Sequence, residues 1–295
     1  GDVTRATGLL EQELHDHPTS IDALWELSGL LIRHDRGDRA EPLLEHLLEL
    51  QPNVSNEIIG SSRRRLAVIL AKKQHYRAFQ RAVALMDQNT AQSPPLATDD
   101  LRAMSTVFHF SPQRSDRLVA IELLENVDDR GQMLPEDRWQ LANLYREVGL
   151  TEKAAPQFHR AAASGLVSPA FLREFVVFLI ESGELLEAEE QLSRLAVDFP
   201  QADRVRLQAV YHAALGHSDE AVAVLDEFVS DETSGLTQVN RLLHAAETCQ
   251  ELLKSRTNAT EMTLSPAVDR YLQAAVDADP NQVKSLVVWL LDRDR

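Results

Sequence analysis

PEDRWQLANLYREVGLTEKAAPQFHRAAASGLVS, residues 135–168, is followed directly by PAFLREFVVFLIESGELLEAEEQLSRLAVDFP, residues 169–200. The two segments repeat one pattern with a stride of 34 residues. Seven positions that are apolar or glycine in the first segment keep that character in the second. The pairs are Leu141 and Phe175, Ala142 and Val176, Tyr145 and Leu179, Gly149 and Gly183, Ala154 and Ala188, Phe158 and Leu192, and Ala161 and Leu195.

Each copy predicts a helix, a tight turn at the glycine, and a second helix. Before the glycine the apolar residues fall at i, i+1 and i+4, and after it at i, i+4 and i+7, which are spacings of one helix face. Two helices alone cannot bury both of their apolar faces. A stride of this length therefore predicts a solenoid in which each helical hairpin packs against the next.

The order of these residues resembles the tetratricopeptide repeat, whose pattern is W-x2-L-G-x2-Y, then A-x3-F, then P. Arg138 stands at the usual Trp position and Trp139 follows it, while Pro200 fits the closing proline. The resemblance implies an all-α, right-handed superhelix of about seven helix pairs with flanking half-repeats. It also implies a concave groove for peptides or proteins, and no catalysis.

The rest of the chain continues the hairpin pattern with looser spacing. Residues 1–18 match a second helix, residues 21–52 a full unit, and the chain ends on an amphipathic helix over 283–291, so we expect a fragment of a longer protein. We expect one superhelix over 1–295. Gln92-Ser93-Pro94-Pro95 breaks a helix and allows a subdivision into 1–90 and 96–295. A loop is expected from Thr257 to Ser265, with Pro266 in the first turn of the next helix.

Composition limits the classes of function. The 295 residues carry a net charge of −16, which disfavours nucleic acid and favours neutral or basic polypeptide partners. A single cysteine, Cys249, excludes an internal disulfide framework and a cysteine-based zinc site. No apolar run reaches about 18 residues and no signal peptide is present, so we expect a cytoplasmic segment with no membrane insertion. The 25 arginines against five lysines are typical of a GC-rich bacterial source.

Residue patterns for catalysis are absent from the sequence. It contains no G-x-G-x-x-G, no P-loop, no H-E-x-x-H and no G-x-S-x-G. His15 and His17 are interpreted as surface residues at a helix C-terminus, and Cys249 as a buried apolar residue. We therefore predict a non-enzyme without cofactor or metal.

The resemblance implies which side chains face the groove. Residues one and five places after the usual Trp position on first helices point there in the family. These positions are Trp25 and Gly29, Trp139 and Asn143, and Arg173 and Val177. Arg146 would flank Trp139. We take Trp25, Trp139, Asn143, Arg146 and Arg173 as candidate partner-binding residues.

Two alternatives stay open at this stage. Either tryptophan can instead turn inward and replace the missing core Trp, which Arg138 favours for Trp139. Arg63-Arg64-Arg65, the basic triplet, is interpreted as a solvated helix face. The Lys, Asn and Arg set with which some family members bind chaperone tails is not carried by this sequence.

The sequence therefore predicts a non-catalytic interaction scaffold that binds a peptide or protein in its groove. The alternative is the recognition or regulatory region of a larger enzyme, or of a secretion or assembly machine.

Overall fold

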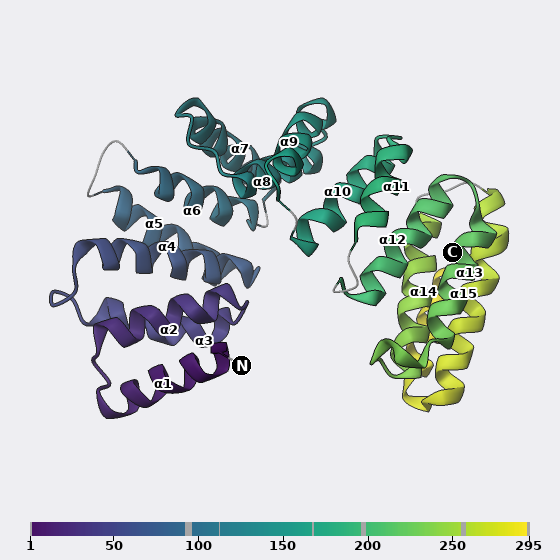
Figure 1. The fold of residues 1–295 in the computed structure, drawn as a ribbon, viewed down its shortest axis with the longest axis horizontal. Helices are drawn as coiled ribbons and strands as arrows, with labels where there is room; N and C mark the ends of the chain where they lie inside the picture. Colours follow the sequence, from purple (N-terminus) through teal and green to yellow (C-terminus); the bar gives the residue numbers. More distant parts are fainter. Residues whose placement is uncertain are drawn as a thin grey trace. The chain divides into compact units, whose positions relative to one another are not determined.

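The computed structural model describes residues 2–91, 96–111, 113–166, 168–195, 199–254 and 258–293. Over these ranges the protein consists of α-helices with two 3-10 turns and no strand (Figure 1). Contacts between helices divide the chain into two compact units, Gly1–Leu166 and Val167–Arg295. The predicted all-α helical-repeat class is confirmed. One superhelix over 1–295, with a possible division into 1–90 and 96–295, stays a prediction.

The first unit holds a single helix and four hairpins, stacked in chain order (Figure 1). The single helix is α1 (Asp2–Asp16). The hairpins are α2 (Ile21–Arg33) with α3 (Gly37–Glu49), α4 (Asn56–Lys72) with α5 (Tyr76–Thr90), α6 (Thr98–His109) with α7 (Arg114–Asp129), and α8 (Pro135–Glu147) with α9 (Thr151–Ala163).

The second unit holds three hairpins and a final helix, α16 (Val283–Arg293). The hairpins are α10 (Pro169–Glu181) with α11 (Leu185–Arg194), α12 (Gln201–Ala214) with α13 (Ser218–Ser230), and α14 (Gln238–Lys254) with α15 (Asn258–Ala278). The described residues thus form seven helix pairs flanked by single helices, as the resemblance to the tetratricopeptide repeat implies.

Glycine in the left-handed region closes the central hairpins. Gly149, Gly183 and Gly216 have φ of +84°, +77° and +83°, a conformation that costs side-chain-bearing residues energy. After Gly149 the amide of Leu150 donates to the carbonyl of Tyr145 over 2.8 Å, which is the bond of a Schellman C-cap. The repeated glycine of the sequence therefore marks a turn that satisfies the end of the first helix.

Each unit buries an apolar core between its helices. In the first unit, alanines let the helices approach closely and leucines fill the space between them, so few aromatic residues are needed. The most deeply buried members are Leu24, Leu44, Leu47, Leu66, Ala40, Ala67 and Ala82. In the second unit the core includes Leu225, Phe228, Ala246, Cys249, Val268 and Ala275.

The predicted loop from Thr257 to Ser265 is wrong over the residues that are described there. Helix α15 begins at Asn258 and contains Pro266 in its interior. An interior proline removes one backbone hydrogen bond and costs about 3 kcal/mol. Leu264, Val268 and Tyr271 are buried, and α15 packs along α14. Burial of such side chains stabilises the helix by about 1.5–3 kcal/mol each, which outweighs the effect of the proline.

Candidate functional site

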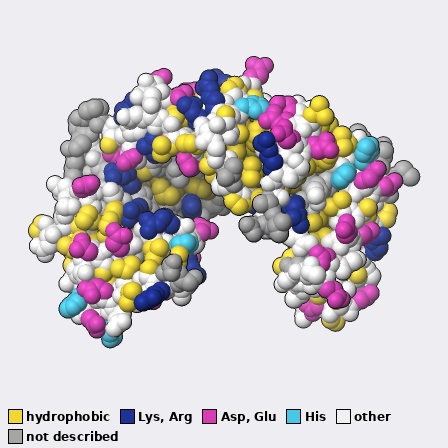
Figure 2. Space-filling model, in the orientation of Figure 1, with side chains coloured by type: hydrophobic (Ala, Val, Ile, Leu, Met, Phe, Trp, Pro, Cys, Tyr) yellow, Lys and Arg dark blue, Asp and Glu magenta, His cyan; other side chains and the backbone are white. Residues whose placement is uncertain are grey.

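The first unit contains a groove of about 680 Å³ along its first helices. The lining residues come mainly from α2, α4, α6 and α8, with others from the turn after α2, the start of α3 and the C-cap of α4. They include Trp25, Ile32, Asp35, Asp38, Ser61, Arg64, Arg65, Val68, Ile69, Lys72, Lys73, Asp99, Arg102, Ala103, Thr106, Asp137 and Gln140. Lys and Arg side chains gather among apolar ones on the face of this unit seen in Figure 2.

The repeat itself explains why the groove is built from first helices. Each hairpin places its first helix on the same side of the stack, so side chains one repeat apart become neighbours. Arg64 pairs with Asp100 over 2.9 Å, Arg102 with Asp137 over 2.8 Å, and the Thr106 hydroxyl donates to Gln140 over 3.3 Å. These partners are separated by 36, 35 and 34 residues.

At the α2 and α4 end of the groove, Arg65 lies over the face of Trp25. The guanidinium carbon is 3.6 Å from the ring centroid, which is a close cation–π stack. Gly29, one turn after Trp25, makes room for it. A Cβ at Gly29 would stand 3.3 Å from Arg65 Nη1 and 3.8 Å from Arg33 Nη1. Trp25 is half-buried and packs on the core, so it both fills the core edge and lines the groove.

The surroundings of Arg65 are unfavourable for its charge. Burial lowers the pKa of Arg65, the neighbouring cations Arg33 and Arg64 lower it further, and Glu26 opposes them. In addition, Arg65 Nη1 is buried without a hydrogen-bond acceptor. Buried donors of charged groups are ordinarily satisfied, because leaving them unpaired costs free energy. Arg65 is thus a cation that stacks on Trp25, is partly removed from water, and keeps an N–H donor without an acceptor.

Arg64 is held by a buried polar network that joins α4, α5 and α6. Asp100 accepts from Arg64 and from Asn89 Nδ2, over 2.9 and 3.3 Å. Asn89 Nδ2 also donates to the carbonyl of Gly60 over 2.9 Å, and its Oδ1 accepts from Arg63 over 3.4 Å. Arg63 is only 7% exposed. Within the basic triplet, Arg63 is buried in the network, Arg64 belongs to the network and lines the groove, and Arg65 lines the groove. The solvated helix face expected from the sequence is therefore wrong.

Arg102 occupies the α6 part of the groove, where two carboxylates and the backbone carbonyl of Gln132 accept its hydrogen bonds. Its Nε and Nη1 donate to Asp137 and Asp99, over 2.8 and 3.0 Å. Burial alone would lower the pKa of Arg102, but these hydrogen bonds and charges raise it above the ordinary value. Lys73, at the rim, pairs with Glu41 over 2.5 Å.

Of the five residues predicted to bind a partner, Trp25 lines the groove of the first unit. Trp139, Asn143 and Arg146 lie on α8, where Asp137 and Gln140 form the lining. Trp139 and Arg146 are half-buried and Asn143 is buried. Arg173 belongs to the second unit, where it lies 3.7 Å from Asp203. A binding role for these five residues stays a prediction.

The groove residues that sequence reasoning missed are Arg64, Arg65 and Arg102. The available signal was the stride: an Arg on one first helix and an Asp one repeat later, as in Arg64 with Asp100 and Arg102 with Asp137. The stack of Arg65 on Trp25 gave no comparable signal, because the two residues are 40 positions apart.

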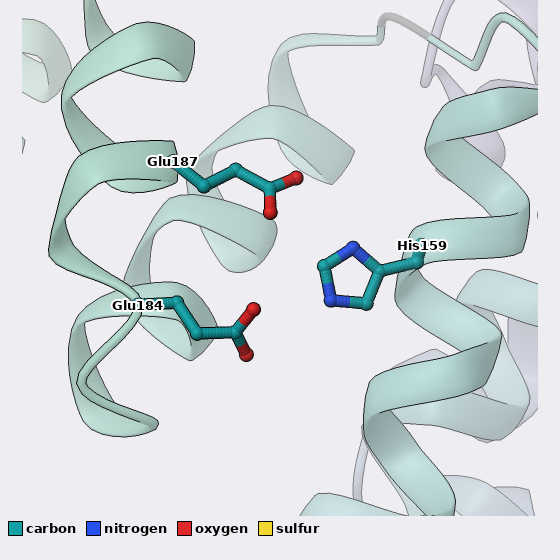
Figure 3. Close-up of side chains that lie close together, drawn as sticks. All are labelled: His159, Glu184 and Glu187. Atoms are coloured by element: carbon teal, nitrogen blue, oxygen red, sulfur yellow. The ribbon is translucent and has the colours of Figure 1, made fainter.

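Metal-binding capacity is limited within each unit. Glu184 and Glu187 stand at the start of α11, while His159, drawn with them in Figure 3, lies on α9 of the other unit. Among the described residues, neither unit by itself brings together three His, Cys or carboxylate ligands.

The lone thiol is inert in its surroundings. Cys249 is buried in the α14 face, and burial raises its pKa to about 12. Because the thiolate is the nucleophile, such a thiol is a structural residue. Within the described residues, no helix combines the length and the apolar character needed to span a bilayer.

Comparisons with known proteins agree with this geometry. Residues 135–198 match the family model of YpiA-like, C-terminal tetratricopeptide repeats. No curated protein sequence matches the chain.

Solved structures with similar folds are helical-repeat proteins. A tetratricopeptide repeat protein from Parabacteroides merdae is 14% identical with a TM-score of 0.51, over 86% of this chain and 92% of that one. A human IFIT1 dimer with PPP-AAAA is 14% identical with a TM-score of 0.66, over 97% and 66%. The APC/C hetero-tetramer Cut9-Hcn1 gives 12% identity and 0.55, over 99% and 53%. At these identities the similarity concerns the fold.

Proposed function

We propose that the chain is a non-catalytic protein-interaction module, because residues 135–198 match a tetratricopeptide-repeat model and the helical-repeat fold is similar to that of a tetratricopeptide repeat protein. Its first unit holds a segment of a partner protein in the groove lined by α2, α4, α6 and α8. This places the partner on the face where successive first helices bring their side chains together.

The observation that carries the proposal is the groove itself. Its volume of about 680 Å³ lies in the usual range for ligand sites, and its lining combines apolar side chains with a few fixed polar groups. Trp25, Ile32, Val68, Ile69 and Ala103 supply the apolar contacts. Aromatic residues in such positions commonly contribute a large share of binding free energy.

RNA is the second class of partner to consider, because the IFIT1 structure contains PPP-AAAA. The groove supports it less well. Asp35, Asp38, Asp99 and Asp137 line the same surface as the basic residues, and the whole chain carries −16. A chain of phosphates needs several cations free of acidic partners. A peptide with one or two acidic groups needs fewer such cations.

The test is a selection of random linear dodecamers, displayed on phage, against the purified protein. Selected peptides are synthesised with a fluorescent label and their Kd values are measured by anisotropy. Trp25→Ala should weaken binding by at least about tenfold, which corresponds to about 1.4 kcal/mol.

Trp139→Ala is the comparison variant, since Trp139 is the same residue type at the equivalent repeat position on α8 but is not among the residues that line this groove. The groove proposal and the binding role expected for Trp139 from the sequence predict different results for this variant, and the groove proposal gives the following one. Trp139→Ala should change Kd by less than about twofold, a difference of about 0.4 kcal/mol. Equal losses in both variants, or none in Trp25→Ala, would show that the peptides bind elsewhere.

A further inference from the structure

The α2 and α4 end of the groove has the construction of an anion site. The Arg65 guanidinium rests on Trp25 with 3.6 Å between the guanidinium carbon and the ring centroid. The aromatic face fixes the plane of the guanidinium, so little conformational freedom is left to lose when an acceptor arrives. Arg65 is half-buried and lines the groove, so the exposed part of its side chain is within reach of a bound segment.

Two cations converge beside Gly29. Arg65 Nη1 and Arg33 Nη1 both lie within 4 Å of the point that a Cβ of Gly29 would occupy. Like charges at such separations repel each other, and the repulsion is stronger where burial excludes water. Arg65 Nη1 is also buried without an acceptor. An anion placed here would relieve the repulsion and satisfy the donor at once.

Three of the four other basic residues that line the groove are paired with acids, while the fourth, Lys72, is exposed at the end of α4. Arg64 is paired with Asp100, Arg102 with Asp137 and Asp99, and Lys73 with Glu41. Arg65 differs from these residues because it is a partly buried cation whose Nη1 has no acceptor and whose neighbour Arg33 is also a cation.

We infer that the groove of the first unit recognises an acidic side chain of the partner segment, an Asp or Glu, through the Arg65 guanidinium stacked on Trp25. This inference rests on the proposed function and names the chemistry of the segment that the groove takes. It differs from the neutral or basic partner expected from the net charge of the whole chain, because the charge at the site differs from the charge of the surface.

A single carboxylate fits the site better than a polyanion. A carboxylate accepts charge-assisted hydrogen bonds from a guanidinium, and the stack on Trp25 fixes the plane in which the donors of Arg65 lie. A phosphate chain running along the groove would also meet carboxylates, because Asp35, Asp38, Asp99 and Asp137 belong to its lining. The lining therefore mixes basic and acidic side chains and offers no continuous basic track.

The experiment is a double-mutant cycle on the peptides selected above. For a selected peptide that contains Asp or Glu, that residue is replaced by Asn or Gln, and both peptides are measured against the native protein and Arg65→Gln. Arg65→Gln should weaken the acidic peptide by at least about tenfold and the amide peptide by less than about twofold. Arg65→Lys should fall between, because a lysine keeps the charge and loses the planar fork.

Two further variants separate recognition from folding. Arg81→Gln is the matched control, since Arg81 lies on the second helix α5, pairs with Glu45 over 2.6 Å and is outside the groove. It should leave both Kd values unchanged. If Arg65→Gln fails to fold, Gly29→Ala serves instead, because its methyl group would stand 3.3 Å from Arg65 Nη1 and displace the guanidinium. It should weaken the acidic peptide several-fold more than the amide peptide.

The outcomes are distinct. Peptides that depend on Trp25 but show no enrichment of Asp or Glu, or no coupling to Arg65, would overturn this inference and leave the proposed function standing. A failure to select any peptide that depends on Trp25 would overturn both. A ten-nucleotide oligouridylate that binds more tightly than the selected peptides, and loses affinity in Arg65→Gln, would replace the peptide with RNA.

Discussion

Asp99 and Asp100 are neighbours in the first turn of α6, but their side chains lie in different environments. Asp100 is 9% exposed and accepts hydrogen bonds from Arg64 and Asn89, whereas Asp99 is 68% exposed and pairs with Arg102. Asp100→Ala should lower the free energy of unfolding by about 2–3 kcal/mol, because it leaves a partly buried arginine and an amide without their acceptor.

Asp99→Ala is the control for this change and should cost less than about 0.5 kcal/mol, as expected for an exposed ion pair. Urea unfolding followed by circular dichroism measures both. Equal values for the two variants would mean that the network of α4, α5 and α6 does not stabilise the first unit.

Cys249 offers a test of packing in the second unit at a single atom. Burial raises the pKa of its thiol to about 12, so the thiolate is scarce at pH 8. Ellman's reagent should react with the native protein at least about a hundredfold more slowly than with the protein in guanidinium chloride. Folding raises the pKa of the thiol from its ordinary value of 9.0, so the neutral thiol is favoured in the folded state. Its contribution to the free energy of unfolding is complete below pH 9.0 and is lost as the pH rises toward about 12. Rapid labelling of the native protein would contradict the buried position.

At the residue scale, the sequence predicted one residue of the candidate site, Trp25, and missed another, Arg65. Trp25 could be assigned to the groove because its position in the repeat defines its face of the helix. Arg65 could not, because its place depends on the absence of a side chain at Gly29 and on the orientation of the Trp25 ring. Those are properties of side-chain packing between two helices, which periodicity does not encode.

Single helices and turns are more predictable, since their signals are local. Gly149 illustrates this, because its φ of +84° is a requirement of the turn, and the space that a methyl group would occupy there is open. Pro266 is the exception, because its local preference for a helix start yields to the burial of α15 against α14. Local rules therefore hold where the chain is exposed and fail where packing outweighs them.

Two glycine substitutions should have opposite effects on the first unit. Gly149→Ala should lower the free energy of unfolding by about 1 kcal/mol, because the cost comes from the left-handed backbone alone. Gly8→Ala should raise it by about 0.5–1 kcal/mol, because Gly8 lies inside α1 with open space around it. Chemical denaturation of both variants checks the pair, and the same sign for both would contradict the assigned backbone conformations.

For the whole molecule, the division into two units has a direct test. Each unit has its own buried core, so a protein of residues 1–166 should fold without the rest. We expect a helical circular dichroism spectrum and a cooperative thermal transition for this fragment. A fragment that is largely unstructured would show that the first unit depends on the second for its stability.

The protein is acidic overall but has a cationic group, Arg65, in its groove, and this difference affects the rates of binding. A negatively charged partner approaching from a distance meets the field of a chain with a net charge of −16 and is repelled. At contact it meets Arg65 and is attracted. Added salt should therefore raise the association rate constant, by screening the approach, and also raise the dissociation rate constant, by weakening the final pair. Stopped-flow measurements at two ionic strengths would separate the two effects. In an equilibrium titration they would partly offset each other, because Kd is the ratio of the two rate constants.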